Sequence, residues 1–387
     1  MKILHVVPSF YPAYSYGGPI RSTFELCRVA REQGGEVRVL TTDADGLDRV
    51  LDVEKNEEVE LPEGFRVRYC PRRLRHSVSP TLLRLLPAYL RWADIVHLTG
   101  VYNFPTFPTV LWTRWLNKPL IWSPRGALQR WERSSRIGPK AVWDFLWYHA
   151  ANRGELTMHV TSEQESREVL LRFPKLKTAM IPNGVDVPVS LHRTERNRDL
   201  RLLFIGRLDP KKGIEALLKA CALLASALPW RLGIAGWGEP EYVSQLKERI
   251  HALGVSGRVE LLGPVLSDKK KDLFECSDVA IVPSYTENFA IVVAEALAHG
   301  VPVIASKGTP WSRLEEIRCG LWVDNDPAIL ADAILRINCM PLQDMGRRGR
   351  EWMQSEFSWG SVTSQMLALY QRVLGANVAE ELVAEHR

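Results

Sequence analysis

Paired cysteines, long apolar runs and a strong net charge are all missing from this sequence of 387 residues, and each absence excludes a class of protein. None of the six cysteines belongs to a C-x-x-C pair, which argues against a zinc or disulfide framework in a chain of this length. No window of about 18 apolar residues predicts a membrane-spanning helix. The first residues lead directly into an apolar strand and do not resemble a signal peptide, so we expect a cytoplasmic protein with reduced thiols.

The charged residues are nearly balanced, with 50 lysines and arginines against 45 aspartates and glutamates. The resulting net charge of +5 suits anionic ligands such as sugar nucleotides or lipid phosphates and gives no indication of nucleic-acid binding. A hydrophobic fraction of 46% together with this length is typical of a globular protein with two domains.

Short apolar segments alternate with longer helical patterns along the chain, which predicts parallel sheets with helices on both faces. Two sets of strands are expected, on either side of a charged stretch at residues 192–199. The first set comprises residues 3–7, 37–41, 65–69, 95–98, 120–123 and 158–161, and the second comprises 201–205, 231–235, 259–262, 279–282 and 301–305. We therefore expect one domain at residues 1–186, a second at 187–357, and a closing helical segment at 358–387.

A basic loop follows the first strand of the second set. It runs from Gly206 to Gly213 and contains Arg207 and Lys212. Glycine lets the chain turn sharply after the strand, and the guanidinium and ammonium groups suit phosphate oxygens. A solvated basic turn is the alternative interpretation of this loop taken alone.

A second signal follows the strand at 279–282, where Glu287 and Glu295 stand eight residues apart around an apolar, helical segment. Free backbone N–H groups at a helix start bind diphosphates. A carboxylate before the helix can accept hydrogen bonds from sugar hydroxyls, and one within the helix can hold a ribose diol. The alternative is an ordinary helix with one capping and one surface glutamate. Two such loops after strands of one domain favour a phosphate site.

Together with the 16–19 loop (Tyr-Gly-Gly-Pro) and the segment at 300–305, these motifs resemble the retaining glycosyltransferases of family 4 (group 1). The resemblance implies the α/β GT-B fold, in which two Rossmann-like domains face each other across a cleft. It also implies an N-terminal acceptor domain, a C-terminal nucleotide-sugar donor domain, and a C-terminal helix that crosses back to the first domain.

The resemblance assigns roles to individual residues. Arg207 and Lys212 match the positions that neutralise the donor diphosphate, Glu287 the carboxylate that orients the transferred sugar, and Glu295 the ribose ligand. The other donor-binding positions that it implies are Gly18, Val265, Asn288, Phe289, Ala290 and Ile291.

The sequence departs from the family pattern in both domains. Asn288 and Ala290 stand where glycines are usual, and Arg125 stands where a histidine is common. Because arginine stays protonated, it cannot act as a base. We therefore expect Arg125 to bind negative charge, on the donor phosphate or on an acidic acceptor, with a purely structural arginine as the alternative. The nearby His149 and His159 are interpreted as ordinary helix and strand residues.

Two further segments bear on cofactors and partners. Asp43 and Asp45 form a D-x-D string, which we interpret as a turn, so that no metal cofactor is expected. Residues 66–92 contain seven arginines and no acidic residue. This stretch predicts either contact with an anionic membrane surface or a core-facing helix with solvated arginines.

These observations predict a metal-independent enzyme that transfers a sugar from a nucleoside diphosphate sugar to a hydroxyl of a sugar or lipid-linked acceptor, with retention of configuration. Assembly of surface polysaccharide or glycolipid is the expected context, in the cytoplasm or on the inner face of the membrane. A nucleotide-sugar epimerase of the same fold and a non-catalytic sugar-nucleotide-binding subunit are the alternatives.

Overall fold

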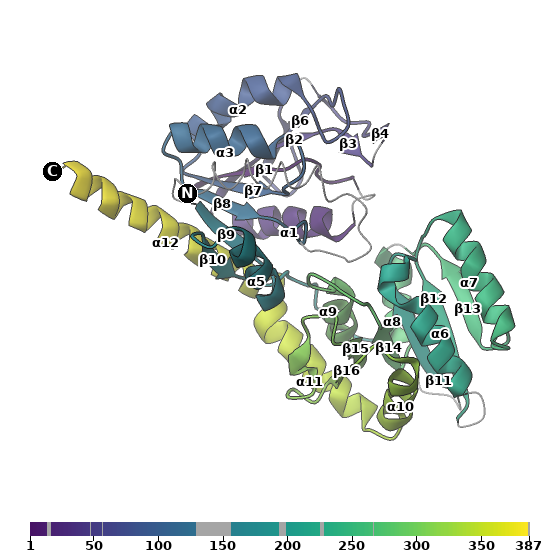
Figure 1. Ribbon diagram of the computed structural model, residues 1–387. Coiled ribbons are helices and arrows are strands. Elements are labelled where there is room, and N and C mark those ends of the chain that lie inside the picture. The colour runs from purple at the N-terminus through teal and green to yellow at the C-terminus, as the bar shows by residue number, and fades with distance from the viewer. Residues whose placement is uncertain are drawn as a thin grey trace. The chain divides into compact units, whose positions relative to one another are not determined.

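The computed structural model divides the chain into two compact units, residues Met1–Gly184 with Trp359–Arg387, and residues Val185–Ser358. It describes residues 1–13, 17–46, 48–55, 57–128, 156–192, 199–224, 228–265 and 267–385 (Figure 1). Tyr16, His149 and most of the charged stretch at 192–199 lie outside these residues, and so do the interpretations placed on them.

The first unit is built on an eight-stranded sheet in the order β10-β9-β8-β7-β1-β2-β6-β5. All neighbouring strands are parallel except β5, which pairs antiparallel with β6 at the edge. The strands are β1 (Lys2–Val6), β2 (Glu36–Thr42), β5 (Val59–Glu60), β6 (Arg66–Cys70), β7 (Ile95–Thr99), β8 (Leu120–Ser123), β9 (Leu156–Val160) and β10 (Lys177–Met180). A separate hairpin joins β3 (Ala44–Asp45) to β4 (Arg49–Val50).

Helices cover both faces of this sheet. As a result, β1, β7, β8 and β9 are buried along all or nearly all of their length. On one face, α2 (Pro80–Trp92), α3 (Thr106–Trp115) and α5 (Glu163–Arg172) enclose a core that includes Trp122. On the other face, α1 (Gly18–Glu32) and α12 (Trp359–Glu385) enclose a second core that includes Tyr370 (Figure 1).

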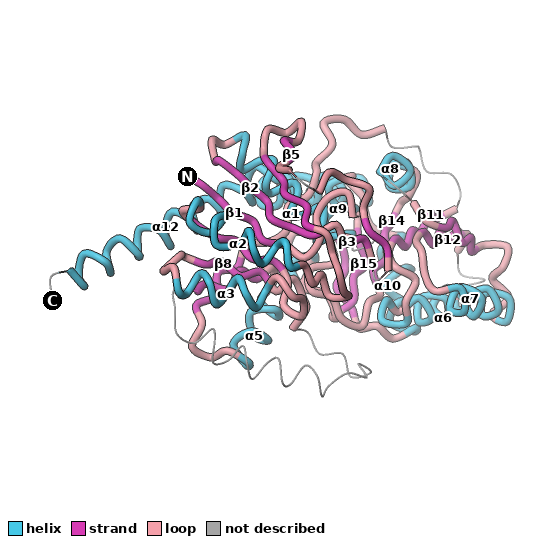
Figure 2. Tube along the Cα trace, turned by 90° about the horizontal axis from the view of Figure 1, so that it is seen from above, coloured by secondary structure: helices cyan, strands magenta, loops and turns pink. Residues whose placement is uncertain are grey.

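The second unit is built on a six-stranded, fully parallel sheet in the order β13-β12-β11-β14-β15-β16. Its strands are β11 (Leu200–Ile205), β12 (Trp230–Ala235), β13 (Val259–Gly263), β14 (Val279–Val282), β15 (Val303–Ser306) and β16 (Gly320–Val323). Figure 2 labels four of these strands, β12, β11, β14 and β15. The central neighbours β11 and β14 carry the two loops that the sequence singles out.

Helices also cover both faces of the second sheet. One core is enclosed by α6 (Ile214–Leu223), α7 (Pro240–Ala252) and α10 (Pro327–Asn338). The other is enclosed by α8 (Ser267–Glu275), α9 (Ile291–Ala298) and α11 (Leu342–Trp352), with short 3₁₀ turns at Pro210–Lys212 and Ser312–Leu314 and a π turn at Met353–Phe357.

The observed strands include the eleven that the sequence predicts, with ends that shift by up to two residues, and add the edge strands β5, β10 and β16 and the β3–β4 hairpin. The largest shifts, of two residues, are in β9 and β15. β15 begins at Val303 because Gly300 ends α9 in the left-handed region, at φ 68°, and Pro302 has no N–H to pair. The predicted basic stretch at 66–92 is not one helix, since Arg66 and Arg68 belong to β6.

Candidate active site

The loop after β11 and the loop after β14 lie side by side at the carboxyl edge of the second sheet, because these two strands pair directly. The N–H of Tyr285 donates to the carbonyl of Lys211 at 2.9 Å, which joins the loops. Gly213 has φ 68°, and a Cβ there would overlap the carbonyl oxygen of Pro283. Glycine is therefore required at this position by both the backbone conformation and the close approach.

Lys212 and Glu287 form an ion pair between these two loops. The Ser284 hydroxyl donates a second hydrogen bond to the Glu287 carboxylate at 2.8 Å. Both charged side chains are mostly buried, which makes their separation costly unless a ligand replaces the lost partner. The basic loop itself is braced by Asp209, whose side chain accepts from the N–H of Lys211 at 2.9 Å.

Arg207 is held differently from Lys212. The side chain is exposed, and its guanidinium carbon lies 5.1 Å from the ring centroid of Trp237, which follows β12. Among the residues that the structure describes, no carboxylate forms an ion pair with Arg207. A cation–π contact orients the guanidinium without neutralising it, so that its N–H donors stay available to an anion.

Glu295 lies in the second turn of α9 and pairs with Lys270 of α8. Its side chain keeps only 13% of its surface exposed. The sequence analysis did not identify Lys270, because no motif in the sequence indicates that residues 270 and 295 are neighbours in the fold. This pair fixes the carboxylate that the family resemblance assigns to the ribose.

Among the described residues, no side chain caps the amino terminus of α9, and the N–H of Val293 donates to the Ala290 carbonyl at 2.9 Å. The two N–H groups before it are left for another acceptor. Ala290 stands directly before the helix with φ 56°, in the left-handed region that favours glycine. This explains the glycine that the family pattern has here, and it shows that this chain adopts the same turn with an alanine. Phe289 packs against Trp311, whose Nε1 donates to the Phe289 carbonyl at 2.6 Å.

Asn288 precedes Phe289 in the same loop and Ile291 is the first residue of α9, whereas Val265 and Gly18 lie in different units. Val265 follows β13 and packs against the core that contains α9. Gly18 is the first residue of α1 in the first unit, directly after Gly17, which has φ 70°. The geometry thus brings Arg207, Lys212, Glu287 and Glu295 to one edge of the second unit, whereas Gly18 and Arg125 belong to the first.

In the first unit, Arg125 follows β8 and its Nη1 donates to the side-chain oxygen of Asn183. A buried chain of hydrogen bonds lies next to it, which the sequence did not reveal. His97 contacts the Tyr370 hydroxyl at 2.5 Å and the Ser123 hydroxyl at 2.6 Å, and Ser123 contacts His159 at 2.7 Å. The chain ends at the carbonyl of Ile181, 2.9 Å from His159.

The end of this chain fixes its direction, because a carbonyl can only accept. His159 therefore donates through Nε2 and accepts from Ser123, Ser123 accepts from His97, and His97 accepts from Tyr370. Burial, together with the charge of Arg125, lowers the pKa of His159 to about 3 and that of His97 well below its usual range. The histidines that the sequence treats as ordinary strand residues are thus neutral parts of one polar network.

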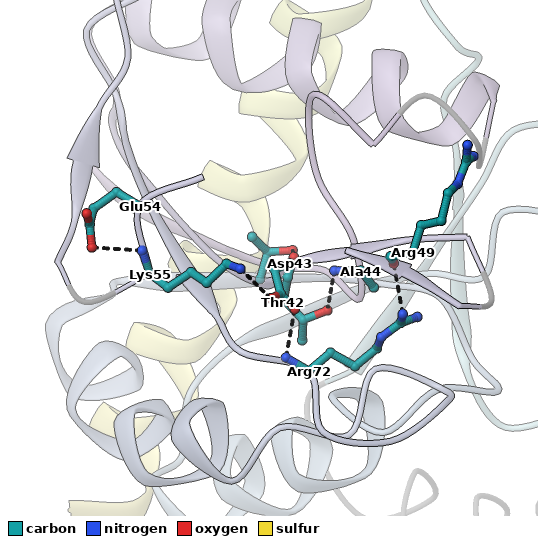
Figure 3. Close-up of polar contacts among 8 residues, drawn as sticks. Thr42, Asp43, Ala44, Arg49, Glu54, Lys55 and Arg72 are labelled. Atoms are coloured by element: carbon teal, nitrogen blue, oxygen red, sulfur yellow. Dashed lines mark hydrogen bonds and ion pairs between the residues drawn. The ribbon is translucent and has the colours of Figure 1, made fainter. Parts of the chain in front are cut away.

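Both aspartates of the D-x-D string have partners within the chain. Asp43 is buried, accepts from the N–H of Arg72 at 2.7 Å, and pairs with Lys55 at 3.2 Å (Figure 3). Asp45 belongs to the β3–β4 hairpin, opposite Arg49. Among the described residues, no three His, Cys, Asp or Glu side chains gather in a group that would hold a metal ion.

Comparison with known proteins identifies the class of this enzyme. Residues 16–188 match the family described as Glycosyltransferase Family 4, and residues 199–338 match Glycosyl transferases group 1. The fold is GT-B, as in the sucrose-phosphate synthase of Thermosynechococcus elongatus, at a TM-score of 0.74 and 20% identity over 97% of this chain and 100% of that one. The protein is a glycosyltransferase, and it belongs to the group 1, or family 4, glycosyltransferases.

Relatives with curated names agree with this assignment. A D-inositol 3-phosphate glycosyltransferase of Jonesia denitrificans is 26% identical over 96% of this chain and 95% of its own length. An uncharacterized glycosyltransferase of Methanocaldococcus jannaschii is 32% identical, but the match spans 44% of each chain. The structure of the Anabaena protein HepE in complex with UDP superimposes with a TM-score of 0.73, at 19% identity over 96% of this chain and all of HepE.

Proposed function

We propose that this protein transfers a sugar from a nucleoside diphosphate sugar to a hydroxyl acceptor, with retention of the anomeric configuration. The observation that carries the proposal is the constellation of Arg207, Lys212, Glu287 and Glu295 beside the uncapped start of α9. Two cations and free N–H groups suit a diphosphate, and two carboxylates fixed by lysines suit hydroxyl groups. The UDP complex of the fold relative HepE is consistent with such a donor.

In the proposed reaction, the bond between C1 of the sugar and the diphosphate oxygen breaks while the acceptor oxygen bonds to C1 on the same face. The acceptor proton passes to the departing diphosphate. Arg207 and Lys212 stabilise the charge that grows on that group, which is the largest single contribution expected from such a site. Glu287 keeps the sugar oriented, and Glu295 holds the ribose.

The donor is identified first by binding. Diphosphate sugars of uridine, guanosine and adenosine are compared by thermal shift, since a ligand that binds the native state raises its melting temperature. Turnover with the best donor is then measured with sugar and lipid-linked hydroxyl acceptors. A product with the donor's anomeric configuration supports the proposal. An epimerised donor without transfer, or binding without turnover on any acceptor, selects one of the two alternative functions.

The two basic residues are tested by substitution. Arg207→Ala and Lys212→Ala should each lose about 2–4 kcal/mol of transition-state stabilisation, the range for one preorganised charge partner. Arg336→Ala on α10, which removes an exposed arginine with only a neighbouring aspartate, is the matched control. Near-normal turnover in both site variants contradicts the assignment.

We further propose that the first unit contacts an anionic lipid surface, which suits a lipid-linked acceptor in polysaccharide or glycolipid assembly. Two of the seven arginines at 66–92 lie in β6, Arg72 donates to two backbone carbonyls, and Arg75 pairs with Asp48. The remaining exposed arginines of the stretch therefore define the surface: Arg73, Arg84 and Arg91.

The neighbouring helix α3 extends this surface. Leu111 and Trp115 of α3 are 42% and 69% exposed, next to the exposed Arg114, and Leu83 of α2 is 40% exposed. Neither helix contains an acidic residue, and both cover the same face of the sheet (Figure 1). Exposed tryptophan and leucine among arginines are the composition of a helix face that binds a membrane interface. Within the described residues, no helix is long and apolar enough to cross a bilayer.

A further inference from the structure

Arg125 is held in an unusual backbone conformation. It follows the last residue of β8 and has φ 53°, and Gly126 follows with φ 76°. An arginine in the left-handed region is strained by about 1 kcal/mol or more, and such strain concentrates at functional positions. The turn directs this side chain, rather than that of a neighbour, toward the carboxyl ends of β1, β7 and β9.

The guanidinium of Arg125 has few hydrogen-bond acceptors among the described residues. Nη1 donates to the amide oxygen of Asn183, whereas Nε is out of contact with solvent and has no acceptor. In the part of the chain that the structure describes, no carboxylate reaches Arg125 within ion-pair distance. Burial accordingly lowers the pKa of Arg125, against the more distant attraction of Glu165.

Glu165 is not a counter-ion for Arg125, because its carboxylate serves the backbone. One oxygen accepts from the N–H of Gly126 at 2.6 Å. The other accepts from the N–H and the hydroxyl of Thr161, at 2.8 and 3.0 Å. Glu165 thus fixes the turn that carries Arg125 and attracts the guanidinium only from beyond ion-pair distance.

The histidines near Arg125 are neutral and add hydrogen-bond donors. His5, His97 and His159 are buried, and their pKa values are lowered by burial and by the positive charge of Arg125. Both ring nitrogens of His5 and the hydroxyl of Thr99 have no partner among the described residues. An imidazole with an unused N–H and a hydroxyl with an unused proton are suited to an oxyanion.

We propose that Arg125, His5 and Thr99, which pairs in register with Ser123 two residues before Arg125, form a subsite for a phosphate or diphosphate group carried by the acceptor. This inference rests on the proposed transfer function and names the class of its acceptor. Arg125 is partly buried and has no ion-pair partner among the described residues, so an incoming phosphoryl group would supply a charge that nothing in this part of the chain provides at contact distance. The five-donor guanidinium fits that geometry, which a histidine at the same position does not.

The test compares Arg125→Met with Arg201→Met by thermal unfolding. Methionine keeps the length and the backbone strain at residue 125 but removes the charge. Arg201 forms two hydrogen bonds with the buried Asp278, at 2.9 and 3.1 Å, and its replacement should lower the melting temperature because a buried carboxylate loses its partner. Arg125→Met should leave the melting temperature unchanged or raise it, because no ion pair is lost.

Ligand binding is measured in the background Arg207→Ala, Lys212→Ala, which silences the proposed donor site. Inorganic phosphate, at matched ionic strength, should raise the melting temperature of this background and fail to do so once Arg125→Met is added. Arg125→Lys, which keeps the charge, should retain part of the shift. The general effect of phosphate on protein stability is the same in all variants and cancels in the comparison.

Vesicles of phosphatidylcholine with and without a polyprenyl phosphate separate a lipid-linked acceptor from a soluble one. Stronger co-sedimentation with the polyprenyl phosphate, lost in Arg125→Met, selects the lipid. Three results overturn the inference: no phosphate shift in the background, a shift that survives Arg125→Met, or an Arg125→Met that is destabilised as much as Arg201→Met. Failure of the proposed transfer function is visible separately, as the absence of any nucleotide-sugar shift in the unaltered protein.

Discussion

Trp237→Leu tests how the enzyme prepares a charge for the donor diphosphate. Lys212 is already paired with Glu287, whereas the only contact that orients Arg207 among the described residues is the indole ring at 5.1 Å. Leucine retains the apolar bulk under the guanidinium and removes the π face. The loop itself should persist, because Leu208 donates its N–H to the carbonyl of residue 237 at 2.8 Å, a bond that any side chain permits.

The expected loss is small and follows from the exposure of the pair. Trp237 is 49% exposed, and exposed cation–π contacts contribute about 0.5–1 kcal/mol. At 1.36 kcal/mol for each factor of ten, kcat/KM for the donor should fall about twofold to fivefold. Arg207→Ala should lose about 2–4 kcal/mol, or about 30-fold to 900-fold, because it removes the charge and not only its orientation.

A double-mutant cycle separates this positioning role from a general effect on the fold. Initial rates at varied donor concentration are measured for the unaltered protein, Trp237→Leu, Arg207→Ala and the double variant. If the indole acts through Arg207, Trp237→Leu has no further effect once Arg207 is alanine. Trp237→Phe should recover part of the loss because phenylalanine restores a π face. Leu223→Ala, at an exposed position of α6 to which no role is assigned, is the control.

Two results refute this reasoning. Equal losses from Trp237→Leu in the presence and absence of Arg207 show that the tryptophan stabilises the loop or contacts a substrate directly. Leucine and phenylalanine variants with the same activity show that the π face is irrelevant. If Arg207→Ala is itself fully active, the assignment of Arg207 to the diphosphate is wrong, and the cycle carries no information about Trp237.

Three further predictions concern metal, membrane and pH. Activity should survive EDTA, and a loss that manganese restores would show that Asp43 and Asp45 bind a metal. The protein should sediment with anionic but not with neutral vesicles, and this binding should weaken at high salt. Arg84→Glu and Arg91→Glu should each weaken it as well, because each arginine near an anionic surface contributes about 1 kcal/mol to membrane binding. The control Lys219→Glu on α6 should have no effect. Because burial lowers the pKa of His5 to about 3, the unfolded chain binds its proton below about pH 6.5 and the native state does not. The free energy of unfolding, measured by urea titration, should therefore decrease as the pH is lowered from about 6.5 to 3, and it should decrease less steeply in His5→Phe. The same pH dependence in His5→Phe and in the unaltered protein refutes this.

The sequence was most informative where one local rule sufficed. Buried parallel strands appear as short apolar runs, and the two loops proposed to bind the donor phosphates are marked by glycine, basic and acidic residues directly after such runs, so both strands and loops could be located without a structure. The edge strands β10 and β16 escaped this rule for physical reasons. β10 has no buried residue, and β16 is four residues long and begins with a glycine, so neither forms a distinctive apolar run.

Pairings between distant residues were beyond the sequence. Lys270 and Glu295 meet because α8 and α9 pack on the same core, and the histidine network joins strands to Tyr370 on the last helix. Each of these residues is unremarkable in its own segment. Their relation depends on the order of strands in the sheet, which fixes the neighbours of each carboxyl end but leaves no mark in the sequence nearby.

For Arg125, the departure from the family pattern excludes one role, and the choice among the remaining roles requires the structure. The replacement of a histidine by an arginine excludes a base at that position, since the guanidinium keeps its proton. It does not decide between a structural ion pair and a ligand site, because that depends on where the carboxylates are. Among the described residues, Glu165 hydrogen-bonds to Gly126 and Thr161 and Asn183 is neutral, and this arrangement favours the proposed ligand site over a structural ion pair.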